Sequence, residues 1–220
     1  MKLTNFLSIF FFLLLHISSC SLPEPNANAH ARDGLSDDYE DFGRVIWQKP
    51  DKVISLFSDL TGKTVADIGA GTGFFSRRLT NSAKKVIAID IDERFITYLD
   101  SIRTDVMPKE FGEKLEPRLS KIDDPLLQAG DVDAVLIVNT FMYMSDHVDY
   151  LKKIENALTP NGEILIVDFK KEWTPVGPPE DIRLDSENAI AFLQDAGFKI
   201  MKKDNRLLDY QYIILAKKNR

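Results

Sequence analysis

Cysteine is nearly absent from this chain of 220 residues, in which Cys20 is the only one. A single cysteine excludes an internal disulfide and a cluster of thiolates around a metal ion, and we expect no metal site. Positive charge is also in deficit, since the sequence has 28 Lys and Arg but 34 Asp and Glu, and the formal net charge is -6. Since Lys and Arg that neutralise phosphates supply most of the affinity for nucleic acids, we expect no nucleic-acid partner.

Long apolar runs are missing too, apart from one close to the first residue. Lys2 precedes an apolar run from Leu3 to Leu15, which is too short to span a bilayer as a mature helix. Such a run is typical of a signal peptide, and we assign residues 1–19 to it. An uncleaved anchor remains an alternative.

The residues that end this run, Ile17-Ser18-Ser19-Cys20, resemble the lipobox of bacterial lipoproteins. The resemblance implies that Cys20 is lipidated and that the protein is anchored in the cell envelope by its lipid. Ser21 resembles the pattern that sorts such proteins to the outer membrane, which would place the chain on the periplasmic side. A generic secretory signal with Cys20 as an ordinary thiol is the other interpretation.

The next segment, residues 20–36, is rich in Pro, Asn, Ala and small polar residues and has almost nothing to bury. This composition predicts a flexible, lipid-anchored tether. The remaining residues, 37–220, suffice for one domain with a full core and leave no room for a second catalytic domain. Nothing in the sequence indicates the oligomeric state.

From Pro50 onward, the sequence alternates between the hydrophobic periods of helices and strands, which predicts an α/β fold with a mostly parallel sheet. Helices are expected from Pro50 to Gly62, from Gly73 to Asn81, through Phe95–Ile102, and from Ser145 and Ser186. We expect seven strands, at Thr64–Ile68, Val86–Asp90, Leu115–Ser120, Val132–Val138, Glu163–Asp168, Phe198–Lys202 and Tyr210–Ala216. The tight connection between the last two predicts that the final strand is antiparallel.

Three alternating glycines, Gly69, Gly71 and Gly73, stand between a predicted strand and a helix. Glycines at such a turn let the backbone approach a ligand closely, and the free N–H groups at a helix start favour an anionic group. The next strand ends in Asp90, at about the spacing from which an acidic side chain reaches ribose hydroxyls. A dinucleotide fingerprint would need glycine where Phe74 stands, which disfavours NAD. A purely structural turn is a further alternative.

The stretch VADIGAGTGFFS followed by VIAIDID resembles the first two motifs of class I S-adenosylmethionine-dependent methyltransferases. The later stretches VDAV and LTPNGEI resemble the fourth and fifth strands of that class. The resemblance implies a Rossmann-like sheet with helices on both faces and S-adenosylmethionine as the cofactor. It also implies that Asp67 orders the loop and faces the methionine amine, that Asp90 holds the two ribose hydroxyls, and that Ile91 flanks the adenine. Four loop residues would line the methionyl and ribose side: Gly69, Ala70, Gly71 and Gly73.

Three further residues are candidates for the same site. Either Asp123 or Asp124 could lie beside the adenine amino group, as such enzymes often place an acid there, but a solvated turn before Pro125 explains them nearly as well. Asn139 directly follows the fourth strand and could contact the methionine end or the substrate. The segment from Trp47 to Pro50 resembles one that closes over the cofactor in a subset of the class, although Trp47 could simply cover the sheet edge.

The methyl acceptor and the catalytic base are less defined. Tyr143 and His147 are our candidates for a base, since His147 has a suitable ordinary pKa, although a surface histidine is the safer interpretation. Asp146, Asp168 and Lys170 also lie near the expected mouth. Related sequences often have a histidine just after the fourth strand, where this one reads Phe-Met-Tyr-Met.

That Phe-Met-Tyr-Met stretch favours an apolar pocket for a small-molecule or lipid-like acceptor, and the proline-rich loop 171–183 could be its lid or a passive crossover. Two other functions stay open, a non-enzymatic envelope lipoprotein that uses the fold as a binding module and an NAD-dependent oxidoreductase.

Overall fold

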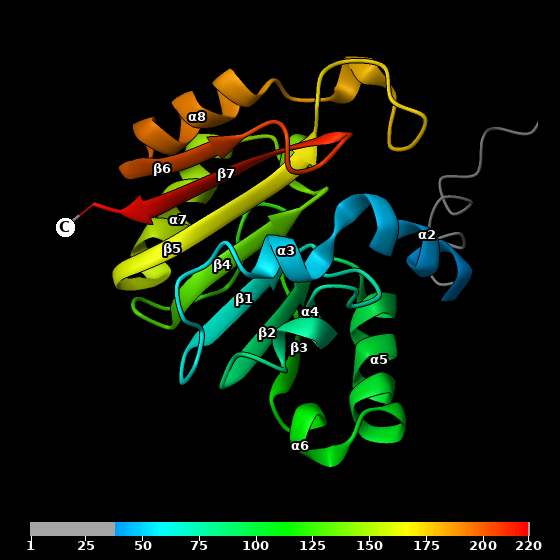
Figure 1. The fold of residues 1–220 in the computed structure, drawn as a ribbon. Coiled ribbons are helices and arrows are strands. Elements are labelled where there is room, and N and C mark those ends of the chain that lie inside the picture. Colours follow the sequence, from blue (N-terminus) through cyan, green and yellow to red (C-terminus); the bar gives the residue numbers. More distant parts are fainter. Residues whose placement is uncertain (1–37, 220) are drawn as a thin grey trace, which may run out of the picture.

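The computed structural model describes residues 38–219, which form a seven-stranded sheet in the order β3-β2-β1-β4-β5-β7-β6. Pairing is parallel from β3 to β5, and β7 runs antiparallel to both β5 and β6, as Figure 1 shows. The expected α/β sheet with an antiparallel last strand is confirmed. The strands are β1 (Thr64–Ile68), β2 (Lys85–Asp90), β3 (Leu115–Leu119), β4 (Val132–Val138), β5 (Leu158–Phe169), β6 (Phe198–Asp204) and β7 (Gln211–Lys218).

Helices cover both faces of this sheet. They are α2 (Asp38–Gln48), α3 (Pro50–Ile54), α4 (Ser76–Leu79), α5 (Glu93–Ser101), η1 (Ile102–Val106), α6 (Lys109–Gly112), η2 (Phe141–Tyr143), α7 (His147–Ala157), η3 (Glu180–Ile182) and α8 (Ser186–Asp195). Alternate residues of a strand point to opposite faces, so in β1 Ala66 packs in one core cluster with α7 and α8, while Val65 packs in the other with α3, α4 and α5. The sheet is thereby buried on both sides, as the long apolar run of β4 requires.

The order of the strands decides where a ligand can bind. Sheet growth reverses direction between β1 and β4, because the chain first adds β2 and β3 on one side of β1 and then β4 and β5 on the other. A crevice opens beyond the carboxyl ends of strands at such a switch point. Figure 1 shows α2 and the loop between β5 and α8 on this same side of the molecule.

Several expected helix boundaries are wrong. Helix α3 ends at Ile54 instead of continuing toward Gly62, because the Ser58 N–H donates to the Glu163 carboxylate, 2.8 Å away, and not to a helical carbonyl. The α4 segment is regular only from Ser76 to Leu79. Helix α2 was not expected at all.

Helix α8 begins at Ser186, as expected, whereas α7 begins one residue later than a cap at Ser145 would place it. The caps are Asp146 and Asp185, and the Asp185 side chain accepts a hydrogen bond from the Glu187 N–H. Carboxylates serve this position as well as hydroxyls do.

The turn expected at Pro160-Asn161-Gly162 lies inside β5. Leu158 pairs with Val132 and Glu163 with Ala134, so four residues of β5 stand opposite one of β4 and form a bulge. Asn161 takes the left-handed conformation there, with φ at 66°.

The predicted signal peptide, Cys20 and the whole of the predicted tether lie outside the described residues. Within residues 38–219, no helix is both long and apolar enough to cross a bilayer.

Candidate cofactor site

The glycine turn after β1 is held against the end of β2 by its backbone. The N–H groups of Gly69 and Ala70 both donate to the Ile89 carbonyl, at 2.8 and 3.0 Å, and the Gly73 N–H closes a turn onto the Ala70 carbonyl. All three glycines have positive φ, at 74°, 53° and 80°, which side chains rarely adopt. The sequence therefore needs glycine at each of these positions for the turn to form.

Two of the three glycines are also required by close packing. A Cβ on Gly69 would lie 2.2 Å from Oγ1 of Thr140, and one on Gly73 would lie 2.5 Å from Cδ2 of Leu99. A Cβ on Gly71 would meet nothing within 4 Å. Gly71 thus faces open space at the centre of the turn, where a ligand can approach its backbone.

Asp90, the last residue of β2, presents a carboxylate to this space. Its Oδ2 accepts from the Gly71 N–H at 2.8 Å and its Oδ1 accepts from the Asp92 N–H at 3.0 Å. A carboxylate offers about four lone-pair directions, so each oxygen keeps a site for a further donor. The side chain is therefore fixed in place and can still accept bonds from two neighbouring hydroxyls.

A cavity of about 390 Å³ lies over these residues. Gly69, Gly71 and Asp90 form its polar end, and Ile91, Phe95 and Ile122 line it together with Thr140, Tyr143, Met144, Tyr150 and others. A small polar patch in a mostly apolar pocket of this size is typical of sites for small molecules and cofactors. The residues present fit a nucleoside, with its ribose at Asp90 and its base against the isoleucines.

Phe74 does not fill this cavity. Its ring is buried under α2, with the guanidinium of Arg44 at 4.3 Å from the ring centroid and that of Arg78 at 4.1 Å. Cation–π contacts of this kind join α2 to the glycine turn. The large side chain that disfavoured NAD binding from sequence is thus a packing element behind the turn.

Asp67, the fourth residue of β1, is buried. Its Oδ2 accepts a hydrogen bond from Oγ of Ser76 at 2.5 Å, which ties β1 to the first residue of α4. Burial raises the pKa of Asp67 to about 6, although Ser76 and the nearby Arg44 oppose the shift. This geometry fits the role of ordering the loop, and contact with a methionine amine stays a prediction.

The two aspartates after β3 have different surroundings. Asp124 closes a turn, with Oδ1 accepting from the Leu126 N–H, and that bond lowers its pKa. Lys153 lies 3.3 Å from the same carboxylate. Asp123 lines a neighbouring cavity of about 400 Å³, which shares Ile122 with the first one. The turn interpretation thus holds for Asp124, and an adenine contact stays a prediction for Asp123.

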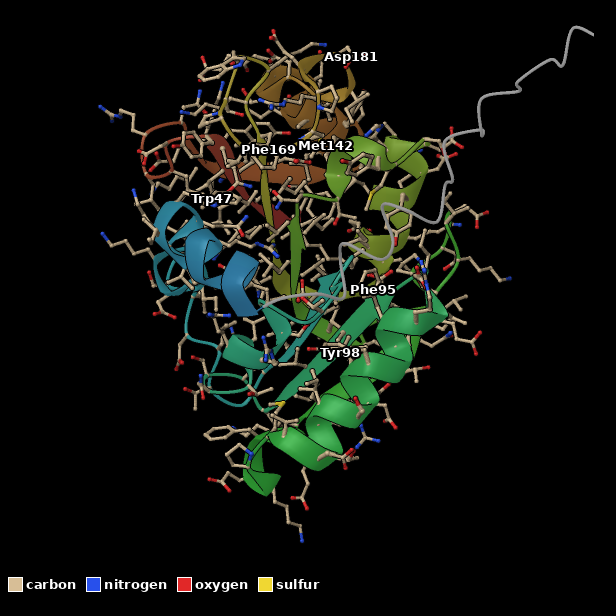
Figure 2. All side chains as sticks on the ribbon, turned by 90° about the vertical axis from the view of Figure 1, so that its right-hand side faces the viewer. Trp47, Phe95, Tyr98, Met142, Phe169 and Asp181 are labelled. Carbon is tan, nitrogen blue, oxygen red and sulfur yellow. The ribbon has the colours of Figure 1, made fainter. Side chains whose placement is uncertain are left out.

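Asn139 follows β4 in the left-handed conformation, with φ at 56°, and its N–H donates to the Val167 carbonyl. Its side-chain oxygen accepts from Nε2 of Gln211, and Gln211 in turn contacts Gln48 of α2. Trp47 packs on Phe169 and Tyr210 at the end of β5, with ring centroids 5.8 and 6.1 Å apart. The two aromatic side chains Trp47 and Phe169 are neighbours in Figure 2. Helix α2 therefore covers the sheet edge beside the crevice.

His147 is held by packing. Its Nε2 lies 3.0 Å from the Phe141 carbonyl, and its ring stacks on Phe192 and meets Phe141 edge to face. Burial lowers its pKa, which keeps it neutral near pH 7. His147 is not among the residues that line the cavity over Asp90. His147 is thus half-buried between aromatic rings and is not a surface histidine, and a role as catalytic base stays a prediction.

Tyr143 does line the cavity and is 59% exposed. Burial of part of the ring and the charge of Asp168 raise its pKa, so it stays protonated and can donate a hydrogen bond. Asp168 itself is buried, and its oxygens accept the N–H groups of Met142 and Phe169 at 2.9 Å each. Burial raises the pKa of Asp168 to about 7.

Arg183 is a residue that the sequence analysis did not single out. It is buried and donates to the carbonyls of Pro178, Lys170, Glu172 and Val176, which fastens the loop after β5. Thr140, whose side chain fits against Gly69, was also missed. Arg183 bonds to carbonyls 5 to 13 residues earlier in its own loop, whereas Thr140 meets Gly69, 71 residues before it. No sequence motif marks either role. Among the described residues, no group of three or more His, Cys, Asp or Glu could hold a metal ion.

Comparisons with known proteins identify the family and the fold. A family model described as a methyltransferase domain matches residues 59–211. A solved structure of an S-adenosylmethionine-dependent methyltransferase from Aquifex aeolicus is 25% identical, with a TM-score of 0.76 over 86% of this chain and 98% of that one.

Two curated relatives are named tRNA U34 carboxymethyltransferase. The one from Shewanella amazonensis is 30% identical over 66% of this chain, and the one from Haemophilus influenzae is 27% identical over 54%. The chain spans 43% and 36% of the length of these two relatives. Together with the strand order, the glycine turn and Asp90, these matches show that the chain belongs to the methyltransferase domain family and has the fold of an S-adenosylmethionine-dependent methyltransferase.

Proposed function

We propose that this protein transfers the methyl group of S-adenosylmethionine to a small acceptor that is at least partly apolar. The observation that carries the proposal is the cavity in which the open side of Gly71 and the carboxylate of Asp90 face an apolar wall. S-adenosylmethionine supplies a methyl group already activated by its sulfonium. The chain therefore has to bind the cofactor, align the acceptor and exclude water.

The described residues divide these tasks between two sides of the crevice. Asp90 accepts the ribose hydroxyls, and Ile91 and Ile122 enclose the base. The open side of the Gly71 backbone faces the polar end. Tyr143, at the opposite wall, can donate a hydrogen bond to an acceptor oxygen or nitrogen. The buried Asp168 holds the Met142 N–H and so fixes the short helix that carries Tyr143.

The rim of the crevice supports an apolar acceptor. Tyr143, which is 59% exposed, and Met144 line the cavity beside the wall formed by Ile91 and Ile122. Exposed apolar groups that gather at the mouth of a pocket mark a surface for an apolar ligand. The relatives named for tRNA suggest nucleic acid as a second acceptor class, which the net charge of -6 disfavours.

Calorimetric titration with S-adenosylhomocysteine tests the cofactor site. We expect Gly71→Asp to abolish binding, because it places a carboxylate beside Asp90, and Asp90→Ala to weaken it about 100-fold through two lost bonds to a charged group. Asp59→Ala is the matched control, since Asp59 accepts the N–H two residues on, as Asp90 does, but outside the cavity. Unchanged binding in both site variants would refute the proposal.

The acceptor is tested with S-adenosylmethionine labelled in its methyl group. Incubation with an envelope lipid fraction, a small-molecule extract or total tRNA, each with and without the protein, separates the acceptor classes. Incorporation into the tRNA alone would overturn the small-molecule assignment. Cofactor binding without incorporation into any fraction would instead favour a binding module that does not catalyse transfer.

We also propose that lipid at Cys20 anchors the domain in the cell envelope, on the basis of the lipobox-like residues alone. Metabolic labelling with radioactive palmitate tests this directly. Label that persists in Cys20→Ser, or that never enters the native chain, would contradict the proposal.

A further inference from the structure

A line of side-chain hydrogen bonds runs from helix α2 across β7 to the end of β4. Nε of Arg44 donates to Oε1 of Gln48 at 2.5 Å, and Nε2 of Gln48 donates to Oε1 of Gln211 at 3.0 Å. Nε2 of Gln211 then donates to Oδ1 of Asn139 at 2.5 Å. Both glutamines are completely buried. Three elements far apart in the sequence are thus joined by one continuous chain of hydrogen bonds, which is called the chain in the following paragraphs.

The direction of this chain is fixed at its first member. A guanidinium can only donate hydrogen bonds, so Gln48 must turn its oxygen toward Arg44 and its NH₂ group away. Gln211 must therefore turn its oxygen toward Gln48 and its NH₂ group toward the oxygen of Asn139. Reversing either buried amide would place two donors or two acceptors opposite each other. The NH₂ group of Asn139 is therefore left pointing away from Gln211 as a donor.

Asn139 directly precedes Thr140, which lines the cavity, and lies on the side of β1 away from Asp90. Asp90 ends β2 on one side of β1, whereas Asn139 follows β4 on the other side. Its neighbour Thr140 fits against Gly69 of the glycine turn. A ligand with its ribose at Asp90 consequently extends its other end over β1 toward Asn139.

We propose that Arg44, Gln48 and Gln211 set Asn139 as a hydrogen-bond donor to the carboxylate of the cofactor's amino-acid end. The inference rests on the proposed function, which places that molecule in the crevice. Of the two polar groups at this end, the carboxylate accepts hydrogen bonds and the ammonium group only donates them. The polarity of the chain therefore selects the carboxylate, and Gln48 and Gln211 are positioning residues that do not touch the ligand.

Gln48→Glu reverses the chain with almost no change in shape. The new carboxylate beside Arg44 stays ionised and only accepts, so Gln211 turns its NH₂ group back toward α2. Asn139 then turns as well and presents its oxygen to the cofactor carboxylate. Asn139→Asp produces the same repulsion directly and serves as the second variant. Gln194→Glu on the exposed face of α8 controls for the added negative charge.

The measurement compares two ligands by calorimetry. S-adenosylhomocysteine carries the amino-acid end, and 5′-methylthioadenosine keeps the nucleoside but lacks that end. We expect each site variant to weaken S-adenosylhomocysteine binding at least about tenfold, as for one lost charge-assisted bond, and to change methylthioadenosine binding by less than about twofold. Gln194→Glu should leave both affinities unchanged.

Equal weakening of both ligands would reveal a purely structural chain and overturn the inference, as would unchanged affinity for both. These outcomes leave the proposed function intact. If the native protein bound neither compound, the proposed function itself would be wrong, and the assignment of Asn139 would be lost with it.

Discussion

The two halves of the crevice are constructed differently. The half over β1 and β2 is made by backbone, since three glycines and the Ile89 carbonyl shape the turn and Asp90 only completes it. The half over β4 and β5 depends on side chains that bind backbone groups, and Arg183, which donates to four carbonyls of the loop after β5, is the extreme case.

This difference has a consequence for tolerance to mutation. A backbone turn fails when an atom is added to it, whereas a side-chain scaffold fails when one of its polar partners is removed. We therefore expect substitutions that add side-chain atoms to damage the half over β1 and β2. Substitutions that remove hydrogen-bonding groups should damage the half over β4 and β5.

The largest effect is expected for Gly69→Ala. Its Cβ would lie 2.2 Å from Oγ1 of Thr140 at a φ of 74°, so both strain and overlap oppose it. We expect a loss of about 3–5 kcal/mol in the free energy of unfolding and at least a 100-fold loss in S-adenosylhomocysteine affinity. Urea unfolding and calorimetry measure the two quantities.

Gly62→Ala is the matched control for that change. Gly62 has φ at 76° but a Cβ there would meet nothing within 4 Å, so only the conformational strain is shared. We expect it to cost about 1 kcal/mol and to leave ligand affinity unchanged. Equal losses in the two variants would mean that the contact with Thr140 does not matter.

The next largest effect is expected for Arg183→Lys. The three N–H donors of a lysine ammonium group share one nitrogen, so they cannot reach all four carbonyls that the wider guanidinium binds. We expect a loss of about 2–3 kcal/mol and faster hydrogen exchange in residues 171–182, with S-adenosylhomocysteine affinity unchanged. Arg206→Lys, on an exposed residue, is the control. A large loss of ligand affinity would show that the two halves are not independent.

The same contrast explains which parts were predictable from sequence. Strands β1, β2, β4, β5 and β7 are rich in apolar residues, and helices separate most strands that follow one another in the chain. The glycine turn with Asp90 lies within 22 consecutive residues, Gly69 to Asp90. Local patterns carry that information in full. In this half, residues that act together in the site are also close together in the sequence.

The other half depends on contacts that no local pattern records. Gln48 and Gln211 are 163 residues apart, and Gln211 and Asn139 are 72 apart. Helix α2 was missed for a related reason, because its contacts with Phe74 and Phe169 are tertiary. His147 seemed a candidate base because its ordinary pKa suits one, but its neighbours Phe141 and Phe192 decide its role.

A smaller effect is expected from the buried carboxyls, one in each half. Burial raises the pKa of Asp67 to about 6 and that of Asp168 to about 7, from 3.8 in the unfolded chain. Between pH 3.8 and the raised pKa, each carboxyl binds more protons in the folded state than in the unfolded state. Its contribution to the free energy of unfolding is therefore lost as pH rises. Asp67→Asn and Asp168→Asn cannot titrate, and Asn offers one acceptor oxygen in place of two.

We therefore expect both variants to be less stable than the native chain by about 1–3 kcal/mol at pH 5. The deficit should shrink as pH rises through about 6 for Asp67→Asn and through about 7 for Asp168→Asn. Thermal unfolding between pH 5 and pH 8 measures these gaps. A gap that is constant with pH would show that the carboxyl concerned does not titrate in this range.

The smallest effect is expected for His147→Phe, which keeps the aromatic packing and removes the bond to the Phe141 carbonyl. It should cost about 1 kcal/mol at pH 7, with methyl incorporation within about twofold of the native value, whereas loss of a general base costs about 100-fold or more. Because burial lowers the pKa of His147, its unfolded form binds more protons below pH 6.5, and the native chain loses stability as pH falls through that value. The variant lacks this loss, so its deficit should narrow toward acid pH. A collapse of methyl incorporation with unchanged stability would restore His147 as the base and move the chemistry away from Tyr143.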